Sequence, residues 1–91
     1  MAHIPHPALQ IVRSEPEDDK IRLEGRLLMD LAVGDVLMYT HRDGHRSLYT
    51  ITRIEAYRHS FDSLNAGMTA AVWVTGSLTT FPDLAEFSLV H

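Results

Sequence analysis

Apolar and polar residues alternate along much of this chain with the period of a half-buried β-strand. In residues 21–27, Ile-Arg-Leu-Glu-Gly-Arg-Leu, polar side chains occupy every second position. Successive side chains of a strand point to opposite faces of a sheet, so such a segment buries one face and exposes the other. Residues 69–75 repeat the pattern, with Ala70, Val72 and Val74 on one face and Thr69, Ala71, Trp73 and Thr75 on the other.

Other segments predict strands because they are rich in β-branched and aromatic residues and end at turn formers. We expect strands at residues 9–13, at 36–40 and from Arg46 to about Tyr57, the last long enough to need a bend or bulge. Residues 59–67 are polar and predict a loop with one helical turn. Residues 87–90 could form a closing strand, with an amphipathic helix over residues 83–89 as the alternative.

Turn signals connect these segments. Asp43-Gly44 predicts a type I′ hairpin turn, which needs positive φ at both central residues. Residues 15–19 hold four acids and a proline, and predict an acidic tip on the first hairpin. Short strands without a long helical period predict an all-β protein, a small closed β-barrel of about six strands. Its expected interior positions include Ile21, Leu23, Val36, Met38, Ile54, Val72 and Val74.

A chain of 91 residues fits one domain. Residues 1–7 hold two prolines and two histidines, which is typical of a flexible N-terminal arm, and residues 8–91 are expected to form the single barrel domain. The start has no basic region followed by an apolar run, and no segment has the length of a membrane span. We therefore expect a cytoplasmic protein without a membrane partner.

Charge and composition exclude several classes of function. The formal net charge of −4 argues against a broad basic face for DNA or an RNA backbone. The absence of cysteine excludes disulfides, thiol catalysis and thiolate zinc sites. His41 and His45 flank Asp43, but a metal site needs three or more oriented ligands, so exposed turn histidines and no metal are expected. Ser60 and Asp62 near His59 do not make a triad by adjacency alone, so no catalytic residue and no cofactor are predicted.

Several short motifs follow one another in an order that resembles a known family. They are Gly25-Arg26, Val33-Gly34-Asp35-Val36, residues 52–58, Ala66-Gly67 and a small-apolar strand ending at Gly76. The order is similar to that of domain 2 of elongation factor Tu and related translational GTPases, a six-stranded β-barrel. The chain departs from the family in its acidic first hairpin, and Met68 replaces the usual aspartate. It also lacks a phosphate-binding loop, so it is not expected to be a GTPase.

The resemblance implies a binding site. In the family this barrel holds the terminal adenosine of aminoacyl-tRNA, and the residues that do so fall by position on Glu55, Arg58 and Trp73. A flat aromatic face, a carboxylate and a guanidinium suit binding chemistry. The alternatives are a plain surface ion pair between Glu55 and Arg58 and a Trp73 ring that fills the barrel core. The sequence thus predicts a stand-alone, non-enzymatic binding module, and its charge favours a protein partner. The alternatives are an RNA- or nucleotide-binding accessory of translation, and an inhibitor or interaction protein that uses the barrel as a scaffold.

Overall fold

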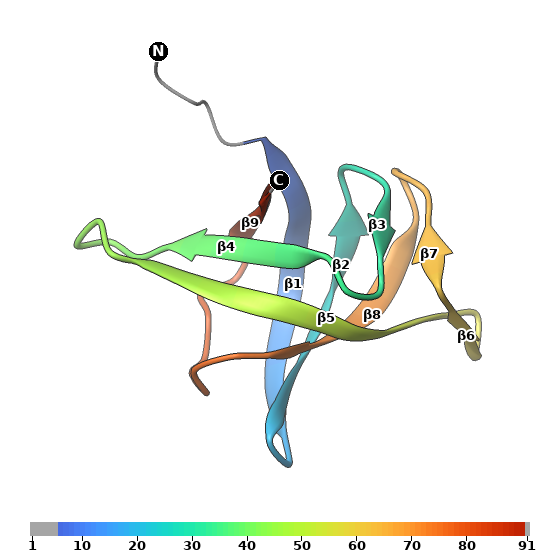
Figure 1. Ribbon diagram of the computed structural model, residues 1–91, viewed down its shortest axis with the longest axis horizontal. Helices are drawn as coiled ribbons and strands as arrows, with labels where there is room; N and C mark the ends of the chain where they lie inside the picture. Colours follow the sequence, from blue (N-terminus) through green and yellow to red (C-terminus); the bar gives the residue numbers. More distant parts are fainter. Residues whose placement is uncertain (1–5, 91) are drawn as a thin grey trace.

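The computed structural model describes residues 6–90, and every regular element in that range is a β-strand (Figure 1). The prediction of an all-β protein is therefore confirmed. No helix that could cross a bilayer occurs in this range. The strands are β1 (Pro7–Glu17), β2 (Lys20–Leu27), β3 (Leu31–Ala32), β4 (Val36–Thr40), β5 (Arg46–Ala56), β6 (His59–Phe61), β7 (Ser63–Leu64), β8 (Thr69–Thr75) and β9 (Glu86–Val90).

Six strands close into an antiparallel barrel in the order β4-β9-β1-β2-β8-β5, with β5 pairing back to β4. Closure removes the free edges of these six strands, which would otherwise invite pairing with other chains. Strand β6 extends the sheet as a hairpin on β5, and β3 pairs separately with β7. The predicted six-strand barrel is confirmed, whereas the loop with a helical turn expected in residues 59–67 is wrong, because β6 and β7 form there.

The end of the chain closes the barrel. Strand β9 lies between β1 and β4, so the strand and not the helix forms in residues 86–90. The structure does not describe residues 1–5 of the predicted arm, and Pro7 already pairs with Ser88. The bend expected in β5 is present as a register shift between Ile51 and Arg53.

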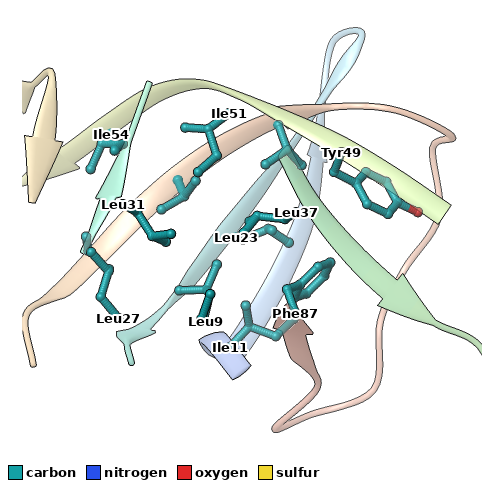
Figure 2. Close-up of a cluster of buried hydrophobic side chains, with 14 of the residues drawn as sticks. Leu9, Ile11, Leu23, Leu27, Leu31, Leu37, Tyr49, Ile51, Ile54 and Phe87 are labelled. Atoms are coloured by element: carbon teal, nitrogen blue, oxygen red, sulfur yellow. The ribbon is translucent and has the colours of Figure 1, made fainter. Parts of the chain in front are cut away.

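The core consists of side chains that point inward from these strands (Figure 2). Five of the seven predicted interior residues are fully buried: Ile21, Leu23, Ile54, Val72 and Val74.

The interior prediction for Val36 and Met38 is wrong, because both are only partly buried and Leu37 between them is 0% exposed. Residues 36–39 are all apolar, so the sequence there contains no alternation that fixes which side faces inward. The register sets Met38 beside Leu48 and Val36 beside Val90. These four residues form what we call the apolar strip on the outer wall of β4, β5 and β9.

The turn chemistry also differs from the expectation. Of Asp43 and Gly44, only Gly44 has a positive φ, at 95°. The His41 N–H donates to the His45 carbonyl at 2.8 Å, which makes a three-residue loop and not a type I′ turn. Positive φ at both central residues occurs instead in the β5–β6 hairpin, at Tyr57 (52°) and Arg58 (65°).

Candidate functional site

Strands β2, β8 and β5 lie side by side, and their outward side chains form one face of the barrel. The register sets Arg22 and Arg53 on either side of Trp73. Two residues along each strand from these positions, Glu24 and Glu55 lie on either side of Ala71. We call this surface, together with the adjoining Tyr57–Arg58 turn, the Trp73 face.

Trp73 points away from the barrel interior, as the alternation in β8 predicts, but it is not an open stacking platform. The Cζ atom of Arg53 lies 4.8 Å from the centroid of its ring, and that of Arg22 lies 5.4 Å away. Both distances suit cation–π attraction. The flanking guanidinium groups help to cover the ring, and only 8% of Trp73 is exposed.

Two matching ion pairs orient these arginines. Arg22 Nη1 donates to Glu24 Oε2 at 2.8 Å, and Arg53 Nη2 donates to Glu55 Oε2 at 2.6 Å. Each pair joins residues two apart on one strand, whose side chains share a face. Surface pairs of this kind add little to stability. Their effect is to hold the guanidinium groups in place beside Trp73.

Two hollows flank this arrangement. The first, of about 340 Å³, has an acidic rim from the β1–β2 hairpin and is lined by Glu17, Asp18, Asp19, Lys20, Thr52, Arg53 and Trp73. The second, of about 220 Å³, is bordered by small residues of β8 and by the β5–β6 turn. It is lined by Arg22, Glu24, Glu55, Ala56, Tyr57, Arg58, Thr69, Ala70 and Ala71.

The β5–β6 turn is unusual in its residues. Left-handed backbone crowds the Cβ atom of an L-residue and costs roughly 1 kcal/mol at each position, which is why Asn-Gly is preferred in such turns. Here the two positions hold Tyr57 and Arg58, and Tyr57 is 77% exposed. The turn thus presents two large side chains to solvent at a cost in backbone energy.

The three residues predicted from the family resemblance share one face but not one pocket. Glu55 and Arg58 line the second hollow, whereas Trp73 lines the first. Arg53 connects them, because it lies beside Trp73 and pairs with Glu55. The sequence prediction missed Arg22, Arg53 and Tyr57. An Arg-x-Glu pattern occurs at both Arg22 and Arg53, and could have drawn attention to the two arginines.

The histidines of the β4–β5 loop pair with each other. The rings of His41 and His45 stack with centroids 3.8 Å apart, and His45 Nδ1 lies 2.9 Å from Asp43 Oδ1. Within residues 6–90 no group of three or more His, Cys, Asp or Glu side chains is placed to hold a metal ion. We interpret these contacts as interactions that stabilise the tip of the β4–β5 hairpin.

Two groups with shifted pKa values lie outside the Trp73 face. Hydrogen bonds from the backbone N–H and the ring of His45 lower the pKa of the Asp43 carboxyl. Burial raises the pKa of the Tyr49 hydroxyl, since removal from water disfavours the phenolate. Neither group adjoins a hollow of the Trp73 face, so neither suggests acid–base chemistry there.

Comparison with known proteins adds no identity. No model of a known protein family matches the chain. No curated protein matches it significantly. The similarity to domain 2 of elongation factor Tu therefore remains a prediction from the residues. The structure itself shows a barrel of the expected strand number.

Proposed function

We propose that this protein is a non-enzymatic binding module that holds a protein partner on its Trp73 face. The observation that carries the proposal is the β5–β6 turn, where Tyr57 and Arg58 occupy left-handed backbone. Backbone strain of this kind persists where the surrounding structure imposes it, and it is found preferentially at functional sites. A turn needed only to reverse the chain would be more stable with Asn-Gly. The presence of Tyr57 and Arg58 in this turn is therefore explained by the side chains that they present and not by the geometry of the turn.

The composition of the face fits an interface. Trp, Tyr and Arg dominate the energetic centres of protein interfaces. The Trp73 face has one tryptophan, one exposed tyrosine and three arginines, and two arginines are already held in place beside Trp73. Side chains that are ordered before binding lose less entropy when the partner arrives.

Charge favours a protein over RNA as the partner. The net charge is −4, and Glu17, Asp18 and Asp19 line one end of the face. Arg22 and Arg53 are each neutralised by a glutamate. A base could stack on Trp73 only after one of these guanidinium groups moved. This combination suits a protein surface better than a phosphate backbone.

Replacing the turn by Tyr57→Asn with Arg58→Gly should stabilise the fold and weaken binding at the same time. Relief of the left-handed strain should raise the free energy of unfolding by about 1–2 kcal/mol, measured by urea denaturation. Loss of both side chains should weaken the native partner by more than about 1 kcal/mol. Quantitative affinity capture from a lysate of the natural host, with wild-type and variant protein in parallel, measures the second effect.

The matched control is Leu48→Asp, which changes the 57% exposed leucine of the apolar strip and leaves the Trp73 face intact. We expect it to capture the same partner as the wild type. The proposal fails if the turn variant captures that partner as fully as the wild type does. Loss of the captured material after ribonuclease treatment would favour the RNA-binding alternative.

A further inference from the structure

We infer that the Trp73 face is polarised, and that its partner lays a cationic group over the first hollow and a carboxylate beside Arg58. The inference rests on the proposed function and specifies the chemistry of the protein segment that the face accepts. It follows from the charged side chains of the face that form no ion pair in the described part of the chain.

The first hollow keeps a negative charge. Lys20 Nζ forms an ion pair with Asp19 Oδ1 at 3.6 Å, and Arg53 is paired with Glu55. Within residues 6–90, Glu17 and Asp18 form no ion pair. A lysine or arginine side chain of a partner would meet two carboxylates there, in a hollow that Trp73 also lines.

The second hollow keeps the opposite charge. Arg22 is paired with Glu24, and Glu55 with Arg53, which leaves Arg58 without an ion pair in the described part of the chain. The guanidinium group can receive a carboxylate through two parallel N–H donors. An aspartate or glutamate of the partner suits this end of the face.

Measured along the strand direction, the two ends are separated by about 20 Å. Lys20 is level with Glu17, and Arg26, six residues further along β2, is level with Thr69 of the second hollow. A strand rises about 3.3 Å per residue, so these six steps cover about 20 Å. An extended segment of seven or eight residues matches that span. The small Ala71 side chain lies between the ends and lets such a segment approach closely.

The opposite charges at the two ends of the face disfavour the binding of nucleic acid. They also determine in which direction a protein segment lies along the face. A phosphate backbone carries one sign of charge along its whole length, so it would be repelled at the acidic hollow wherever it gained at Arg58. A segment with a basic end and an acidic end gains at both. Complementary charges of this kind set orientation and association rate more than total affinity.

Two synthetic octapeptides of equal composition test the inference. One carries two lysines at one end and two glutamates at the other, separated by four threonines; the second carries the same residues with lysine and glutamate alternating. Trp73 is the only tryptophan in the chain, so its fluorescence reports binding at this face. At 50 mM salt the block peptide should bind about fivefold more tightly than the alternating peptide, an effect in the range of exposed ion pairs.

Neutral variants assign the two ends. Glu17→Gln with Asp18→Asn should reduce the affinity of the block peptide to that of the alternating peptide, and asparagine suits the positive φ of 57° at position 18. Arg58→Gln should do the same. Arg42→Gln, which changes an exposed arginine of the β4–β5 loop, should have no effect.

Equal or undetectable binding of the two peptides would overturn the inference, as would tighter binding of octauridylate than of either peptide. This failure is distinct from failure of the proposed function. If the turn variant loses the native partner while the peptides bind equally, the binding face stands and its polarity is wrong. If the turn variant binds the native partner as tightly as the wild type does, the proposed function itself is wrong.

Discussion

Replacing Phe87 by alanine should lower the free energy of unfolding by about 4 kcal/mol, within the range of buried aromatic truncations. Phe87 is 0% exposed and belongs to β9, the strand that closes the barrel. Its ring packs against three other aromatic rings, with centroid distances of 5.3 Å to Tyr39, 5.9 Å to Tyr49 and 4.9 Å to Phe81. The truncation removes one member of each pair and leaves a void that the strands on either side cannot fill.

Urea denaturation followed by far-ultraviolet circular dichroism measures this loss. The control is Leu78→Ala at a 55% exposed position, which should change the free energy of unfolding by less than about 0.5 kcal/mol. A loss of about 1 kcal/mol or less for the Phe87 variant would contradict the packing described for this end of the barrel.

The substitution Gly25→Ala should be almost as damaging, with an expected loss of about 3 kcal/mol or more. A Cβ atom at position 25 would collide with the carbonyl oxygen of Gln10 and lie 2.6 Å from the Ile11 Cα. Both are backbone atoms of β1, so no side-chain rotation relieves the clash. Strand β1 would have to move away from β2 at the register shift after Ile11.

Gly44→Ala is the matched control, because no atom of residues 6–90 lies within 4 Å of a Cβ atom there and only the positive φ of 95° is strained. Its expected cost is about 1 kcal/mol. Both variants are compared by thermal and urea unfolding. If Gly25→Ala were as stable as Gly44→Ala, the close contact between β1 and β2 would not be a feature of the folded protein.

The sequence alone determined the strands whose two faces differ in polarity. In β2 and β8 every inward position that was predicted is buried, and the bounds of β8 agree with the predicted residues 69–75. Alternation is a local property of consecutive side chains, so it can be recognised before any pairing is known. The same reasoning favoured the outer face for Trp73 but left burial in the core open, and the structure places Trp73 outside the core cluster with 8% of it exposed.

Where neighbouring residues are alike, the sequence could not decide. Residues 36–39 are all apolar, and only pairing with β5 and β9 turned Leu37 inward and Val36 and Met38 outward. The turn prediction failed for a related reason. The type I′ geometry depends on how two strands twist and align, and the hairpin register gave it to Tyr57 and Arg58 in place of the better-suited Asp43-Gly44.

The sequence determined one part of the candidate site, and the tertiary structure determined the rest. The sequence, read through a family resemblance, indicated Glu55, Arg58 and Trp73, and the barrel places all three on one face. Only the tertiary structure brought Arg22 and Arg53, which are 31 positions apart in the sequence, to the two sides of Trp73. Residues on adjacent strands meet according to hydrogen-bond register and barrel closure, and these depend on the whole chain. Local periodicity fixes which way a side chain points, whereas closure fixes what it meets.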